Sequence, residues 1–184
     1  MKLLGKIAGV CAIVIAGGVI LGSISAARAE TAAGRTVDVM SEIYTDYAAG
    51  ENGPRYIKQE LLRRGYQADR IDAALESCDI DWNKRAVRAA QTFSSQAKGG
   101  VSQMSMAKFL AQIGYDREQI VYALENSGID WNANAWRDAR IIIEKYGDDL
   151  DEEEVRAFLT KVGFLKEQVE YGCRHRLEAA LSDK

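Results

Sequence analysis

One segment of this 184-residue chain occurs twice at a fixed spacing and a third time in weaker form. The first copy contains Gly65-Tyr66 and reads Ile-Asp-Trp-Asn at 80–83. The second copy lies 49 residues later, with Gly114-Tyr115 and the same four residues at 129–132, and Gly163-Phe164 follows at the same interval. A period of this length is typical of stacked units that bury their apolar faces against each other. The repeat predicts a helical array whose function lies on an extended face rather than in a pocket.

Each repeat is predicted to contain three helices. The first begins near Pro54, carries Ile57 and Leu61 on one face, and is followed by Gly65. Glycine is common just after a helix because it adopts the left-handed conformation without a Cβ clash. The equivalent turn glycines are Gly114 and Gly163.

The second helix is predicted over about 68–76, where apolar residues recur at helical spacing. Asp81 and Asp130 are predicted N-caps of the third helices, since a carboxylate there accepts from free backbone N–H groups. Trp82 and Trp131 open these helices, and we expect them to be packing anchors rather than ligand platforms.

These patterns predict an all-α fold, a short curved array of tandem three-helix repeats. The expected divisions are a leader at 1–29, the closing helix of an incomplete leading repeat at 30–53, full repeats at 54–102 and 103–150, and a truncated repeat at 151–184. The Ser/Gly-rich stretch at 94–103 is predicted to be a mobile connection. The acidic stretch at 147–154 is expected to enter the last repeat, where acids complement the helix macrodipole.

The N-terminus has the organisation of a secretory signal. Lys2 and Lys6 precede an uncharged run at 7–27, and Ala27-Arg28-Ala29 matches a cleavage site. Cleavage after Ala29 is favoured, but the run is also long enough for an uncleaved membrane anchor. Cleavage predicts export to the periplasm, and an uncleaved segment predicts an anchor in the inner membrane. Only residues 7–27 are expected to contact the membrane, and only if they are not cleaved.

Three cysteines do not form a disulfide framework. Cys11 lies in the apolar run, and Cys173 occupies the repeat position of Leu75 and Leu124, which predicts a buried core side chain. If the protein is exported, a Cys78–Cys173 bridge remains an open alternative.

Several of these segments together resemble the RecX family. The residues are Gly-Pro-Arg-Tyr-Ile-Lys-Gln-Glu-Leu at 53–61, Arg64-Gly65, Cys-Asp-Ile-Asp-Trp at 78–82, and the final repeat with Phe158-Leu159 and Gly163-Phe164. The resemblance covers roughly 37–181. It implies a cytoplasmic regulator that binds filaments of the RecA recombinase and so modulates recombination, DNA repair and the SOS response.

The sequence shows no catalytic constellation, phosphate-binding loop or zinc spacing. His175 is the only histidine, which excludes a histidine-cluster metal site. We therefore expect no enzymatic activity, no metal or other cofactor and no small-molecule substrate.

The candidate partner-binding surface is basic. Between Pro54 and Lys98 the sequence has nine Lys and Arg residues and six acidic residues, although the whole chain has a formal net charge of −3. The candidates, which in a RecX-like protein would face the filament and its DNA, are Arg55, Lys58, Arg63, Arg64, Lys84, Arg85 and Arg88. The alternative is a solvated helix face with internal ion pairs. The excess of positive charge is too small for strong autonomous nucleic-acid binding.

The alternative function is an exported or membrane-tethered helical adaptor with a different partner.

Overall fold

The computed structural model describes residues 39–47, 50–147 and 150–182, so the leader-like segment at 1–29 lies outside the described residues. Within these ranges every regular element is a helix. The all-α prediction is therefore confirmed. Among the same residues, no helix combines the length and the apolar character needed to cross a bilayer.

Helices of the same kind recur with nearly constant bounds. The first helices of the repeats are α3 (Pro54–Arg63), α6 (Gln103–Gln112) and α9 (Glu152–Val162). The second helices are α4 (Ala68–Ser77), α7 (Arg117–Asn126) and α10 (Lys166–Ser182). The third helices are α5 (Trp82–Gln96) and α8 (Trp131–Tyr146). Ahead of them lie the short α2 (Val39–Glu42) and the π-helical turn η1 (Ile43–Tyr47), where the sequence predicts a closing helix. Equivalent helices begin 49 residues apart.

The helix ends follow the local signals in the sequence. The Asp81 side chain accepts from the Lys84 N–H at 3.0 Å, and Asp130 accepts from the Ala133 N–H at 2.9 Å. Both N-cap predictions are confirmed. Gly65, Gly114 and Gly163 have φ of 91°, 95° and 98°, the left-handed region that glycine tolerates best.

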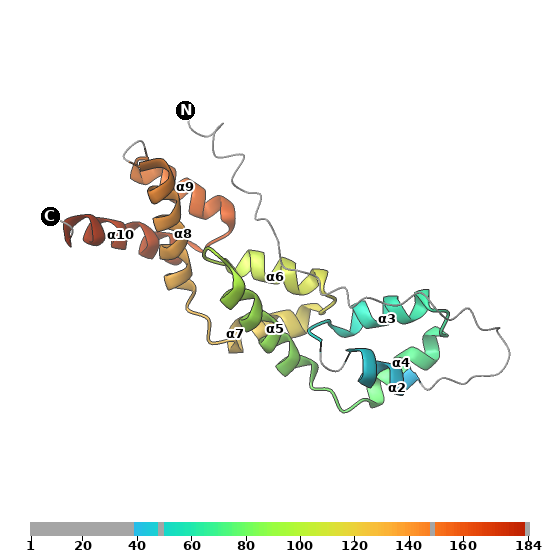
Figure 1. The fold of residues 1–184 in the computed structure, drawn as a ribbon. Coiled ribbons are helices and arrows are strands. Elements are labelled where there is room, and N and C mark those ends of the chain that lie inside the picture. Colours follow the sequence, from blue (N-terminus) through green and yellow to red (C-terminus); the bar gives the residue numbers. More distant parts are fainter. Residues whose placement is uncertain (1–38, 48–49, 148–149, 183–184) are drawn as a thin grey trace.

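The hydrophobic cores do not coincide with the sequence repeats. Each core combines the third helix of one repeat with the first two helices of the next. We call these groups the first packing unit (α2, η1, α3 and α4), the second packing unit (α5, α6 and α7) and the third packing unit (α8, α9 and α10). They follow one another along an elongated array (Figure 1). A boundary placed at the start of a first helix, as at 54, 103 or 151, therefore separates helices that share a core.

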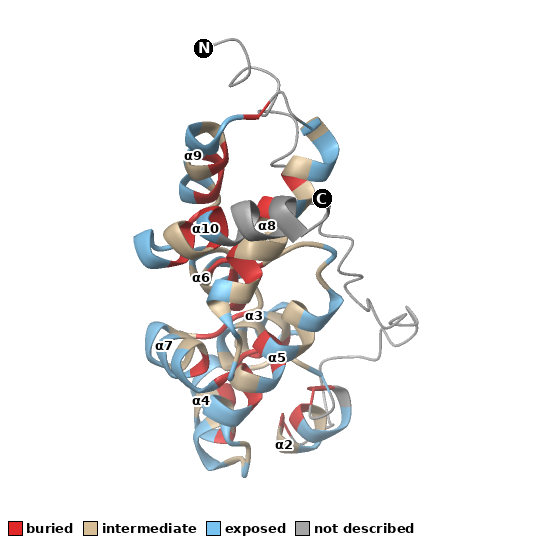
Figure 2. Cartoon of the chain, turned by 90° about the vertical axis from the view of Figure 1, so that its left-hand side faces the viewer, coloured by how far each residue is buried: buried red, intermediate tan, exposed pale blue. Residues whose placement is uncertain are grey.

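Buried residues lie where helices meet, and exposed residues cover the outward sides (Figure 2). Trp82 is half-buried against the core of the first packing unit, and Trp131 is half-buried against that of the second. Each tryptophan opens a helix of the following unit, so it connects two neighbouring cores. The predicted packing role is confirmed.

Cys78 and Cys173 do not form a disulfide with each other, so the alternative of a Cys78–Cys173 bridge is wrong for this structure. Cys78 ends α4 in the first packing unit. Cys173 is 1% exposed within the core of the third unit, as its repeat position predicts.

The connection between α5 and α6 differs from the predicted mobile stretch. Helix α5 continues to Gln96, and the remaining connection is attached to α8. The Gly100 N–H donates to Asp138 Oδ1 at 2.6 Å, and the Val101 N–H donates to Asn134 Oδ1 at 2.9 Å. A Cβ on Gly100 would come within 1.9 Å of the Asn134 carbonyl oxygen, so this glycine permits close packing rather than mobility.

Asp138 gives this attachment a pH dependence. Burial raises the pKa of its carboxyl from 3.8 to about 6, although the Gly100 N–H and Arg137 act in the opposite direction. Because the folded-state pKa exceeds the unfolded value, Asp138 favours the folded state most at low pH, and this contribution is lost as pH rises through about 6. We expect Asp138→Asn to raise the free energy of unfolding by about 2 kcal/mol at neutral pH, where an amide avoids the buried charge and still accepts from Gly100.

Urea unfolding of the full chain between about pH 4 and pH 7 measures this effect. The exposed Glu125→Gln is the matched control. Stability curves for Asp138→Asn and the wild type that stay parallel over this pH range would contradict the assignment.

Candidate partner-binding surface

The family-like Gly-Pro sequence lies at the junction between the first two packing units. The Gly53 N–H donates to the Ile113 carbonyl at 2.7 Å, and the Arg55 N–H donates to the Gly114 carbonyl at 3.1 Å. A Cβ on Gly53 would come within 2.5 Å of the Gly114 carbonyl group. The glycine at 53 is therefore needed for the close approach of α3 to the turn after α6.

The second junction repeats this arrangement. Ser102 caps α6, and its Oγ donates to the Val162 carbonyl at 2.8 Å. A Cβ on Gly163 would lie 2.6 Å from the Cβ of Met104. At both junctions the start of one first helix covers the turn glycine that follows the next first helix.

Arg85 lies inside the first junction rather than on the surface. Its side chain is 2% exposed, its Nη2 donates to the Tyr47 carbonyl, and its guanidinium carbon lies 5.3 Å from the centre of the Trp82 ring. Burial lowers the pKa of Arg85 and raises that of the adjacent Tyr115, whose hydroxyl donates to the Glu51 carbonyl at 2.8 Å. The expectation that Arg85 faces a partner does not fit this position. Arg85 occupies the repeat position of Asn134, which is also buried and holds a preceding loop, but the sequence shows the burial of neither residue.

Four other candidates form ion pairs within the chain. Lys58 Nζ lies 2.6 Å from Asp72, Arg63 lies 2.8 Å from Glu60, and Lys84 lies 3.2 Å from Asp81. Arg64 pairs with Glu42 at 2.8 Å and also lies over the Tyr47 ring. These contacts correspond to the alternative reading of a solvated face with internal ion pairs. Exposed pairs of this kind contribute little to stability.

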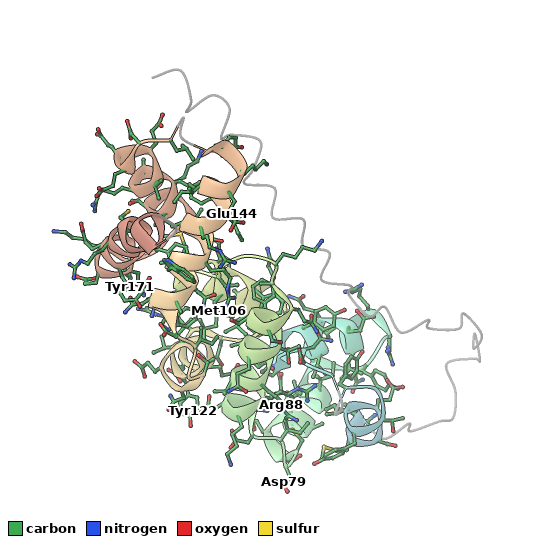
Figure 3. The ribbon with its side chains drawn as sticks, turned by 60° about the vertical axis from the view of Figure 1, so that its left-hand side comes forward. Asp79, Arg88, Met106, Tyr122, Glu144 and Tyr171 are labelled. Atoms are coloured by element: carbon green, nitrogen blue, oxygen red, sulfur yellow. The ribbon has the colours of Figure 1, made fainter. Side chains whose placement is uncertain are left out.

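Arg55 and Arg88 are the candidates with a different environment. Both are exposed, and neither forms an ion pair with the residues that the structure describes. The backbone of Arg55 contacts Gly114, and the charge of Arg88 acts to lower the pKa of the neighbouring Tyr115. Arg88 lies on α5, near the middle of the array (Figure 3). We define Arg55 and Arg88 as the junction arginines, because both lie around the first junction.

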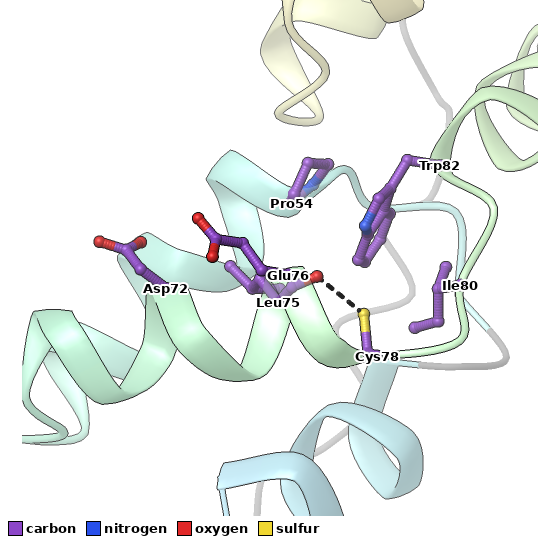
Figure 4. Close-up of a pocket in the computed structure, with 7 residues that line it drawn as sticks. All are labelled: Pro54, Asp72, Leu75, Glu76, Cys78, Ile80 and Trp82. Carbon is purple, nitrogen blue, oxygen red and sulfur yellow. Dashed lines mark hydrogen bonds between the residues drawn. The ribbon is translucent and has the colours of Figure 1, made fainter.

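Two open hollows flank Trp82. One has a volume of about 360 Å³ and is lined by Pro54, Asp72, Leu75, Glu76, Cys78, Ile80 and Trp82 (Figure 4). Its Cys78 Sγ donates to the Leu75 carbonyl at 3.1 Å, and burial raises the pKa of the thiol. A raised pKa disfavours the thiolate, so Cys78 lacks the activation of a nucleophilic cysteine.

The second hollow, of about 490 Å³, lies between the starts of α5 and α7 and includes Asp81, Asp116 and Glu118. Asp81 and Asp116 both serve as helix N-caps, which explains part of this acidic lining. Over the described ranges, no group of three or more His, Cys, Asp and Glu side chains is placed to hold a metal ion.

Comparison with known proteins gives no family for the chain. No family model matches the sequence, and no curated protein matches it at a significant level.

Proposed function

We propose that this protein is a RecX-like, non-enzymatic regulator that binds filaments of a RecA-type recombinase and thereby modulates recombination and DNA repair. The observation that carries the proposal is the pair of junction arginines, which are exposed and have no ion-pair partner among the described residues. Arginine recognises carboxylates and phosphates through several N–H donors at once. A filament of protein on DNA offers both groups.

The shape of the molecule supports the same proposal. Packed helical units follow one another along an elongated array (Figure 1), which gives the molecule an extended outer face. An extended surface suits a partner whose subunits recur along an axis, because contacts from several units then add to one binding energy.

The family-like motif supports the proposal in a second way. Gly53 and Gly114 occur where the backbones of the first two units contact each other, and Arg55 follows directly on the same helix turn. The motif therefore both joins the units and presents one of the junction arginines.

The test is inhibition of DNA-dependent ATP hydrolysis and strand exchange by a RecA-type recombinase. We expect the full chain to inhibit both, and Arg55→Glu/Arg88→Glu to weaken the apparent affinity about tenfold, because charge-assisted contacts become repulsive. The matched control is Lys108→Glu/Arg117→Glu, which makes the same change of charge at exposed positions of α6 and α7. Equal inhibition by the two double variants would contradict the proposed binding role of the junction arginines.

The leader-like segment favours a second candidate, an exported or membrane-tethered adaptor. Lys2, Lys6 and the uncharged run at 7–27 are the observation behind it. The same assay separates the candidates, because an adaptor with another partner leaves the recombinase unaffected even at saturating concentration.

A further inference from the structure

Each junction has two halves, a turn glycine and the helix start that covers it. The junction is formed twice, and a further turn glycine near the start of the array has no helix start over it among the described residues. Gly114 and Gly163 are buried by the starts of α3 and α6. Gly65 occupies the same repeat position and has nearly the same φ, 91°, but it is exposed, and a Cβ added there would meet no described atom within 4 Å. The Gly65 turn therefore offers the acceptor side of a junction.

The other half recurs at the opposite end of the array. Arg55 and Met104 contact the turn glycines at the two formed junctions. Glu153 occupies the equivalent position at the start of α9. The described residues after α9 form only α10, so they provide no further turn glycine for α9 to cover. Glu153 is exposed, and it forms no ion pair within the described ranges.

The helix start of α9 is acidic, whereas the two residues before Gly65 are arginines. Asp151, Glu152 and Glu153 form an acidic start to α9, where Glu152 pairs with Arg156 at 2.9 Å. Arg63 and Arg64 directly precede Gly65. They pair with Glu60 and Glu42, but the Arg63 side chain is still 69% exposed and can also reach a docked carboxylate. Arg64 stands where the formed junctions have Ile113 and Val162. An acidic helix start facing an arginine-bearing turn is electrostatically favourable.

We propose that the start of α9 in one copy of the chain docks on the Gly65 turn of a second copy, with Glu153 over Gly65 and beside Arg63. A second copy is the occupant because it supplies the equivalent helix start with the complementary charge. Among the described residues, each copy keeps one uncovered turn glycine and one helix start that covers none, so the contact is heterologous and extends into an open chain of copies. This self-association is independent of the proposed recombinase regulation.

Sedimentation velocity of the full chain, over a range of protein and salt concentrations, tests the proposal. We expect the mean sedimentation coefficient to rise with protein concentration and this rise to weaken in high salt. Arg63→Glu alone and Glu153→Lys alone should each weaken association at least about tenfold, because the docked surfaces then carry like charges.

An equimolar mixture of the two variants should associate as the wild type does. In that mixture the introduced lysine of one variant faces the introduced glutamate of the other. The unchanged Glu153 likewise faces the unchanged Arg63, so every contact is again complementary. The variants Glu125→Lys and Lys108→Glu change exposed charges away from both halves and should leave association unchanged, and circular dichroism should show unchanged helix content in all variants.

Three results would overturn the proposal. One is a wild type that stays monomeric at every protein concentration. Another is association that both single variants retain, which would place the contact elsewhere, for example in the apolar run at 7–27. The third is a mixture that fails to restore association.

Discussion

Gly114→Ala is expected to destabilise the protein by about 4 kcal/mol, a large effect for a single methyl group. The added Cβ would lie 2.3 Å from the Tyr56 nitrogen and 2.5 Å from the Tyr56 Cβ. These atoms belong to the start of α3, so the clash is relieved only by moving that helix away from the second packing unit. The left-handed conformation, with φ of 95°, adds about 1 kcal/mol for any residue other than glycine.

Gly65→Ala is the matched control for this prediction. Gly65 has φ of 91°, but no described atom lies within 4 Å of the position of an added Cβ. Gly65→Ala should therefore lower the free energy of unfolding by only about 1 kcal/mol, the conformational contribution. The measurement is the free energy of unfolding in urea, at protein concentrations low enough to keep the chain monomeric. Equal losses at the two glycines would show that close packing at the junction contributes nothing.

Arg85→Ala is expected to lower the free energy of unfolding by about 3 kcal/mol. The substitution removes a charged donor from the Tyr47 carbonyl and the packing of a guanidinium on Trp82. It also leaves a cavity between two packing units, because Arg85 is 2% exposed. Arg85→Met retains most of the volume and removes a buried charge, so its loss should be only about 1 kcal/mol.

Arg88→Ala provides the comparison for Arg85. It removes the same side chain less than one helical turn away, at an exposed position, and should change stability by at most about 0.5 kcal/mol. Urea unfolding measures all three variants. If Arg85→Ala and Arg88→Ala proved equally mild, the buried arginine would have no part in holding the first junction together.

The helices were predictable from the sequence because their signals are local. Asp81 and Asp130 satisfy N–H groups three residues away, and the turn glycines adopt a conformation that depends on one residue. The burial of Ile57, Leu61 and Ile71 follows from their helical spacing. Features decided within a few residues thus appear in both sequence and structure.

Features that depend on contacts between units were not predictable in the same way. A tandem repeat has the same sequence pattern whether its third helix packs backward or forward, so the grouping of α5 with α6 and α7 is visible only in the structure. The attachment of Gly100 to Asp138 joins residues far apart in the sequence, and the Ser/Gly composition of that connection gave no sign of it.

The candidate partner-binding surface was predictable from the sequence only in part, for the same reason. A count of charges places Arg55, Arg85 and Arg88 in one basic segment, although Arg85 is buried and the other two are exposed. The difference arises from the Tyr47 carbonyl and the Trp82 ring, which only the folded chain brings to Arg85.

Every core is built in the same way, from the third helix of one repeat and the first two helices of the next. This regularity has a consequence for how such a chain can change in length. Because equivalent helices start 49 residues apart, an in-frame duplication of that length within 54–182 inserts one whole core together with one whole interface. The position of the crossover does not matter, since each break is rejoined to an equivalent residue. Unequal recombination within the gene could therefore lengthen or shorten the protein by whole packing units.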